Sequence, residues 1–118
     1  MSQYLGRAVI AYDGKTLNAM PGASIDLGGV ARKPINTMSQ TGYAEERKHA
    51  VVECEVPVSK DTPDAEIAAI VNATVTFRAD TGQTWMVRNA FCEDTLKLSA
   101  KDGGGMKLKL SGDPAERV

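Results

Sequence analysis

The chain has few cysteines, almost no net charge and no long apolar run, and each of these absences excludes a class of protein. Two cysteines in 118 residues cannot build the disulfide framework of a small secreted scaffold. The formal net charge of −1 gives no bulk electrostatic reason for binding nucleic acid or anionic membranes. No apolar run approaches the ~20 residues of a membrane span, and the first residues lack the features of a signal peptide. We therefore expect one cytosolic domain over residues 1–118.

The two cysteines, Cys54 and Cys92, fall in strand-like segments and form no CxxC motif. A reduced thiol behaves as a small hydrophobe and is often buried. We expect two buried or half-buried thiols, with a disulfide or metal site as the alternative.

The clearest structural pattern is an antiparallel hairpin over residues 72–92. Residues 73–79 alternate between apolar and polar, and Asp80-Thr81-Gly82 supplies a turn with a glycine for positive φ. The return strand places Trp85, Val87 and Phe91 on one face. Because this segment holds the only tryptophan and both phenylalanines, it predicts the centre of the core.

Further strands are expected over residues 7–12, 15–19, 24–27, 49–58, 95–100 and 106–111. Residues 61–64 resemble a helix start, followed by the apolar stripe Ile67, Ile70 and Val71. The pattern predicts a mainly β fold, a β-sandwich or small barrel with one short flanking helix. Residues 112–118 are typical of a polar C-terminal tail.

Residues 28–48 have weak periodicity and mostly small or polar side chains. Structureless loops of this length are uncommon in compact domains unless they are functional or disordered. A mobile loop or a ragged strand pair is one interpretation. The retained Val30, Ile35, Met38 and Tyr43 favour the other, an arm that becomes ordered against another subunit.

The search for catalytic, cofactor and metal sites finds no candidate, so an enzyme is not expected. Gly14-Lys15-Thr16 resembles the end of a P-loop, but Val9 stands where the upstream glycine belongs. The Gly103–Gly105 run is a loop, and His49 lacks a plausible Ser or Cys partner. Glu53 and Glu55 share one strand face, where a solvated or channel-facing acidic strip is more probable than acid–base chemistry.

The order of several segments resembles the tail tube proteins of Mu-like contractile-tailed bacteriophages across essentially the whole chain. These segments are GRAVIAYDGK, PGASIDLGGVARKPI, HAVVECEV, TPDAEIAAIVNATVTF and DTGQTWMVRNAFC. None is a functional signature alone, and their order and spacing together carry the resemblance.

The resemblance implies a virion protein, assembled in the host cytoplasm, whose six-membered rings stack into a hollow tube. The implied partners are the tail sheath, tape-measure, baseplate and tail-terminator proteins, with double-stranded DNA passing through the lumen and no membrane. It also implies that the segment 28–48 contacts neighbouring subunits. The residues that we expect in this contact are Arg32, Lys33, Pro34, Ile35, Met38 and Tyr43.

A lumen that lets DNA slide is expected to be acidic or neutral rather than basic. We therefore expect Glu53 and Glu55 to face the lumen. Lys97, Lys107 and Lys109 form a basic strip, which we place elsewhere, on an interface or on the sheath side.

Two alternatives remain open at the level of sequence. One is a tube subunit of a secretion or injection machine that carries protein. The other is a monomeric β-sandwich that binds a small ligand or carbohydrate, for which the candidate exposed aromatics are Tyr4, Tyr12 and Tyr43.

Overall fold

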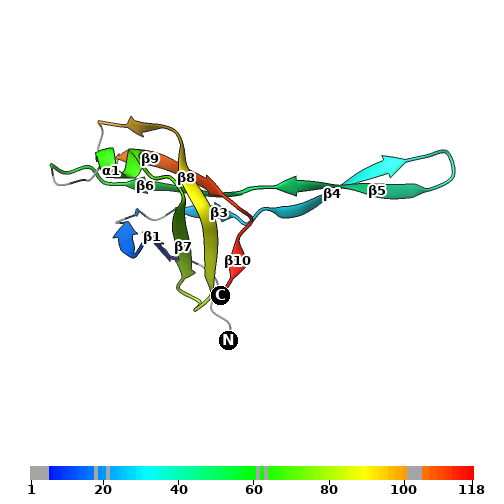
Figure 1. Cartoon of the computed structure of the whole chain (residues 1–118), viewed down its shortest axis with the longest axis horizontal. Helices are drawn as coiled ribbons and strands as arrows, with labels where there is room; N and C mark the ends of the chain where they lie inside the picture. Colours follow the sequence, from blue (N-terminus) through cyan, green and yellow to red (C-terminus); the bar gives the residue numbers. More distant parts are fainter. Residues whose placement is uncertain (1–5, 18, 21, 61, 63, 101–104) are drawn as a thin grey trace.

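A computed structural model describes residues 6–17, 19–20, 22–60, 62, 64–100 and 105–118. A body of β-strands lies at one end, and a long two-stranded hairpin extends sideways from it (Figure 1). The molecule measures 62 × 40 × 29 Å, with a radius of gyration of 17.0 Å. A compact domain of this length has a radius of roughly 13–14 Å. The projecting hairpin accounts for the difference.

The elements in chain order are β1 (Ala8–Tyr12), β2 (Lys15–Leu17), β3 (Ser24–Asp26), β4 (Gly29–Asn36), β5 (Thr41–Lys48), β6 (Ala50–Val56), α1 (Asp64–Ala68), β7 (Ala73–Ala79), β8 (Thr84–Leu98), β9 (Met106–Gly112) and β10 (Glu116–Arg117). Every strand pairing is antiparallel.

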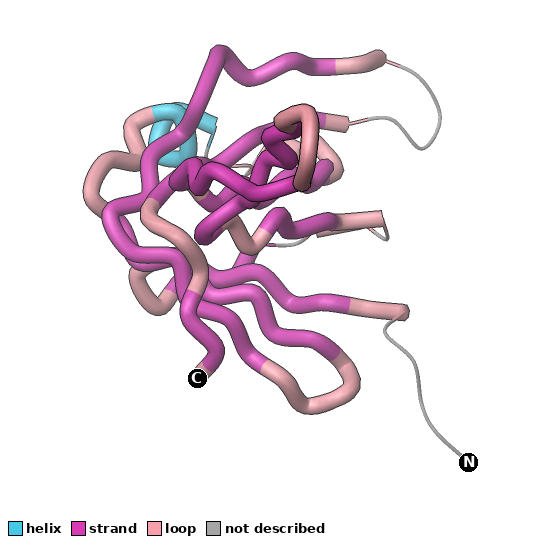
Figure 2. The backbone as a smooth tube through the Cα atoms, turned by 90° about the vertical axis from the view of Figure 1, so that its right-hand side faces the viewer, coloured by secondary structure: helices cyan, strands magenta, loops and turns pink. Residues whose placement is uncertain are grey.

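The long strand β8 connects two halves of the body. Its first half pairs with β7 and its second half with β9, giving the order β2-β1-β7-β8-β9-β6-β3, with β10 beside β8. The chain folds into layers around one apolar core (Figure 2). The predicted mainly β fold with a short helix is thus confirmed.

The core is filled from both layers. Phe77 and Val75 of β7, Ile10 of β1, and Val52 and Leu110 of β6 and β9 are each at most 2% exposed. Phe77 packs near Trp85, with ring centroids 6.3 Å apart. Burying such side chains stabilises the fold by about 1.5–3 kcal/mol each. Alternation along these strands is what turns the apolar residues inward.

Two turns lie between strands that the sequence predicts. Asp13 and Gly14 join β1 to β2 with φ values of 46° and 81°. Gly82 joins β7 to β8 with φ 98°, and its N–H donates to the Ala79 carbonyl. The P-loop-like residues 14–16 therefore lie at a hairpin turn and in the strand β2 that follows it, and Lys15 forms an ion pair with Glu66 of α1.

Phe91 corrects the predicted core face of β8, because it is 45% exposed while its neighbour Ala90 is buried. Asn89 adopts φ 53°, and the β7–β8 register shifts between Ala73 and Val75. This bulge adds a residue and reverses which side chains point inward. The alternation of apolar and polar residues in the sequence cannot reveal that the side chains after the bulge change sides.

The helix is shorter than predicted, and Val71 is exposed because α1 ends at Ala68. Ile67 and Ile70 do pack into the core, as expected. Residues 61 and 63 of the predicted helix start lie outside the described residues. Within the part of the chain that the structure describes, no helix is long and apolar enough to cross a bilayer.

The C-terminal segment is not a free polar tail. Glu116 and Arg117 form β10 and pair with Met86 and Trp85. The Val118 N–H donates to the carbonyl of Thr84. The backbone of these polar residues is therefore hydrogen-bonded to β8. The polar composition of the segment does not indicate this pairing.

Candidate functional site

Residues 28–48 form an ordered hairpin, which corrects the interpretation as a long loop; of the expected alternatives the strand pair is the nearest, and it is regular rather than ragged. Strands β4 and β5 pair without interruption from Gly29↔Lys48 to Asn36↔Thr41. We call residues 29–48 the arm. Eight residues of antiparallel strand extend about 27 Å, so the arm reaches far beyond the body (Figure 1).

The arm ends in a well-bonded turn. The N–H of Thr37 donates to the Gln40 carbonyl at 2.9 Å, and the Thr37 hydroxyl accepts from the Gln40 N–H at 3.2 Å. The Thr41 hydroxyl donates to the Asn36 side chain at 2.9 Å. Met38, at the tip, is fully exposed.

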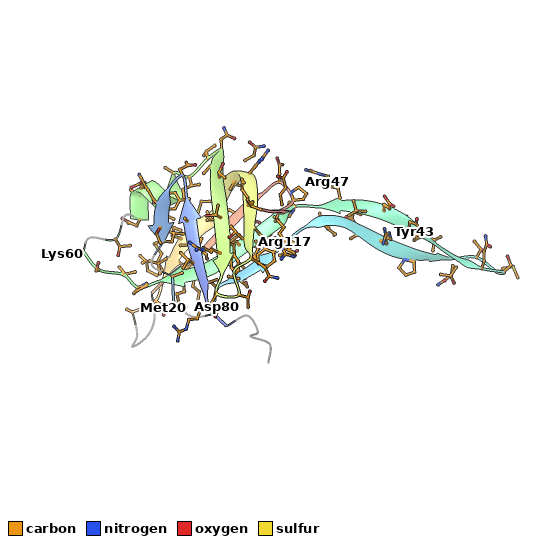
Figure 3. The ribbon with its side chains drawn as sticks, turned by 90° about the horizontal axis from the view of Figure 1, so that it is seen from below. Met20, Tyr43, Arg47, Lys60, Asp80 and Arg117 are labelled. Carbon is orange, nitrogen blue, oxygen red and sulfur yellow. The ribbon has the colours of Figure 1, made fainter. Side chains whose placement is uncertain are left out.

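All six residues that we expect to contact a neighbour lie on the arm and are exposed; they are Arg32, Lys33, Pro34, Ile35, Met38 and Tyr43. The Arg32 guanidinium lies over the Tyr43 ring, 5.4 Å from its centroid. Tyr43 lies partway along the arm and Arg47 near the body (Figure 3). The arm therefore presents apolar and cationic groups far from the core.

The base of the arm is held firmly against the body. A Cβ on Gly28 would lie 2.7 Å from backbone atoms of Lys48 and His49, so the chain crosses there only because residue 28 is glycine. The Leu27 carbonyl accepts from the Ala115 N–H at 2.8 Å. These contacts fix where the arm leaves the body.

A second candidate surface lies on the outer side of β3, β6, β9 and the second half of β8. Its charged side chains are Asp26, Glu53, Glu55, Glu93, Lys97, Lys107 and Lys109. We call it the charged face. Several of these side chains line a hollow of about 400 Å³.

The register of β6 and β9 overturns the predicted separation of acids and lysines. Glu53 lies opposite Lys109, with an Nζ–Oε1 distance of 3.8 Å, and Glu55 lies opposite Lys107. Lys97 pairs with Lys107 on the other side of β9. The lysines therefore share the face with the glutamates, and the face is of mixed charge rather than acidic.

Glu93, which no sequence pattern singles out, completes this face. It lies opposite Lys109, and its carboxylate accepts a hydrogen bond from the buried Ser111 hydroxyl. Residues 84–98 form one strand instead of the two predicted, and Leu98 at its end is 64% exposed. The β8–β9 register shifts between Glu93 and Lys97 by two residues, so both side chains stay on the same face.

The described residues contain no group of three or more His, Cys, Asp or Glu side chains placed to hold a metal ion. His49 is exposed between β5 and β6. Cys54 is buried, Cys92 is half-buried, and neither is in a disulfide. Burial raises the pKa of the Cys54 thiol to about 12, so this thiol is protonated at neutral pH.

A strand-built body with a projecting arm is typical of a structural subunit that assembles with others. The chain belongs to the phage tail tube protein family, because the sequence model of that family matches residues 1–117. It is 35% identical over 117 residues to the tail tube protein of Escherichia phage Mu, covering 99% of this chain and 97% of the relative. It is 32% identical to the Mu-like prophage FluMu tail tube protein of Haemophilus influenzae, covering 99% and 98%.

The family is one of structural proteins of the phage tail, not of enzymes. This membership places the chain in the virion. It also decides among the alternatives left open by the sequence in favour of a phage tail tube protein of the Mu type.

Proposed function

We propose that six copies of this chain form a ring, and that the rings stack into a tube that conducts double-stranded DNA during ejection. The observation that carries the proposal is the arm, an ordered and fully projecting hairpin in a tail tube protein. The contacts within a ring must join two different surfaces of neighbouring subunits, so that rotation about the axis closes the ring. Stacking then repeats the ring along the same axis.

The arm is the proposed contact between neighbouring subunits. Ile35 and Tyr43 are 50% and 63% exposed, although burial of such side chains is favourable. Packing against another copy would remove this apolar surface from water.

The test is to replace residues 33–43 with a short glycine–serine turn. The core contains no residue of the arm, so the variant should remain a folded monomer with an unchanged thermal midpoint. It should form no tubes in negative-stain electron micrographs at concentrations where the full chain does. Long tubes from the shortened protein would remove the arm from the assembly mechanism.

The charged face is the proposed lining of the lumen, with Glu53 and Glu55 directed inward. The charged face spans four strands of the sheet, β8, β9, β6 and β3. Six copies joined edge to edge would give about 24 strands and, at ~4.8 Å per strand, roughly 37 Å between opposite backbones. Strand tilt widens such a barrel further. Inward side chains would still leave room for a double helix.

The lysines of this face give the proposed lumen a nearly balanced charge. Lys109 and Lys107 lie opposite the two glutamates, so phosphates would meet neither a basic strip nor a strongly acidic one. The affinity of a protein surface for DNA rises steeply with the number of phosphates that the surface contacts. A mixed lining is therefore suited to passage rather than to retention.

Charge reversal tests this lining. The double variant Glu53→Lys, Glu55→Lys would place five lysines on the face of each subunit, counting Lys97, Lys107 and Lys109. We expect intact tubes but delayed or blocked genome ejection, measured as DNA release from purified virions. The neutral double variant Glu53→Gln, Glu55→Gln is the control and should eject DNA with a smaller delay. Unchanged infectivity of the lysine variant would contradict the assignment.

The sheath, tape-measure, baseplate and tail-terminator proteins are the proposed partners of the assembled tube. The outer side of β1, β7 and the first half of β8 is available for the sheath; it carries Val9, Thr76, Arg78 and Arg88. Co-purification of sheath protein with tubes, lost on Arg78→Glu, would support this placement.

A further inference from the structure

We infer that the arm joins a neighbouring copy by adding β5, and not β4, to an exposed sheet edge on the body of that copy. The inference rests on the proposed tube assembly and names the backbone edge that makes the contact. It follows from the hydrogen-bonding direction of each residue in the arm and from the position of one proline.

The turn sets which backbone groups point between the two strands. The N–H of Thr37 donates to the carbonyl of Gln40, so both residues direct these groups inward. Inward and outward directions alternate along an antiparallel strand. On β4, residues 31, 33 and 35 therefore bond to β5, and Arg32, Pro34 and Asn36 face the outer edge.

Pro34 lies at the centre of that outer edge of β4. Proline has no N–H, so it is found on strand edges whose N–H side is unpaired. Its pairing with Tyr43 proceeds without a register shift, as an outward position requires. A further strand could not form a regular ladder with β4 across residue 34.

The outer edge of β5 has no such block. Thr41, Tyr43 and Glu45 direct their N–H groups outward by the same alternation. Residues 41–44 contain no proline and no charged side chain, two of the devices that protect edge strands. β5 therefore keeps a continuous edge of donors and acceptors that can form a ladder.

The arm also lacks a third strand. Within the described residues it is a separate two-stranded sheet. An isolated two-stranded hairpin is at best marginally stable in water, and a third strand or a packing partner stabilises it. Strand addition supplies both hydrogen bonds and burial, as in other cases of β-augmentation.

The acceptor is an edge of the body and not a second β5. Two identical edges paired antiparallel are related by a two-fold axis, which closes a dimer and stops growth. A tube grows by heterologous contacts, so β5 must meet a different edge of the neighbouring copy.

Amide hydrogen exchange resolves the two edges. In the free subunit the amides of Arg32, Asn36, Tyr43 and Glu45 should all exchange rapidly, since all point outward. In assembled tubes we expect protection of Tyr43 and Glu45 by about 100-fold or more, with Arg32 and Asn36 still rapid. Equal exchange on the two edges in tubes would overturn the inference.

Proline substitution at a directly paired position provides the second test. Arg32 and Glu45 lie opposite each other, and both direct their N–H outward. Relative to Glu45→Ala, Glu45→Pro should raise the minimum concentration for polymerisation about tenfold or more. Arg32→Pro should match Arg32→Ala within about threefold.

The outcomes separate the two levels of the proposal. Failure of the unmodified chain to form tubes would contradict the proposed function itself. Normal tubes from the unmodified chain, together with equal behaviour of Glu45→Pro and Glu45→Ala, would contradict only the use of β5. Stable dimers of the subunit that are lost on Glu45→Pro would show two-fold pairing of β5 and would also reject the inference.

Discussion

The guanidinium of Arg47 lies 3.6 Å from the carboxylate of Asp113, linking the end of the arm to the segment that follows β9. The other carboxylate oxygen of Asp113 accepts a hydrogen bond of 2.7 Å from the Asn89 side chain. One side chain thus connects the arm to the bulge of β8. Because the pair is exposed, its contribution to overall stability is small, and it joins the end of the arm to the body.

We predict that Asp113→Ala loosens the arm more than it destabilises the body. The thermal midpoint should fall by about 4 °C, since roughly 1 kcal/mol of hydrogen bonding is lost. Nuclear magnetic relaxation should show lower order parameters for arm amides. Glu46→Ala is the control, because it removes only the Lys48–Glu46 pair within the arm. Equal arm motion in both variants would show that Asp113 does not hold the arm.

We predict that Gly28→Ala is strongly destabilising and that Gly42→Ala is not. At residue 28 the φ of 69° is unfavourable for alanine, and the added Cβ would clash with the backbone of Lys48 and His49. At residue 42 no atom lies within 4 Å of an added Cβ. Urea unfolding should show a loss of about 2 kcal/mol or more for the first variant and a change within about 0.5 kcal/mol for the second. Equal losses would contradict this account of the arm base.

The parts of the fold that alternate between core and solvent could be predicted from the sequence. Val52, Cys54 and Val56 point inward from β6, and Met106, Leu108 and Leu110 do so from β9. In these strands burial itself creates the pattern that the sequence displays. The order of the segments also identified the family.

The arm could not be predicted in this way, because all of β5 and most of β4 are exposed. Without a buried face there is no apolar alternation, and only cross-strand pairs such as Arg32 with Glu45 indicate a hairpin. Only part of the charged face can be predicted from the sequence. Glu53 and Glu55 share one face of a single strand, but their position opposite Lys109 and Lys107 depends on a long-range register.

Substitutions of Asn89 test what holds the bulge that turns Phe91 outward. We predict that Asn89→Val costs about 1–3 kcal/mol, because a β-branched residue is strained at φ 53°. Asn89→Gly loses the same hydrogen bond to Asp113 but accepts this φ readily, so the difference between the two variants isolates the backbone effect. Denaturant unfolding measures both. If glycine and valine are equally destabilising, the side-chain hydrogen bond, and not the backbone, holds the bulge.

The buried thiol of Cys54 gives a pH dependence whose sign follows from its raised pKa. Its ordinary value is 9.0, and burial raises it to about 12. The folded state therefore keeps the proton that the unfolded state loses, so this stabilisation is full below pH 9 and declines as the pH rises towards 12. Relative to Cys54→Val, which has no such group, the unfolding free energy should fall by about 1.4 kcal/mol per pH unit between pH 9.5 and 11. Urea titrations in reducing buffer across this range measure the difference, and parallel curves for the two proteins would show that the thiol ionises equally in both states.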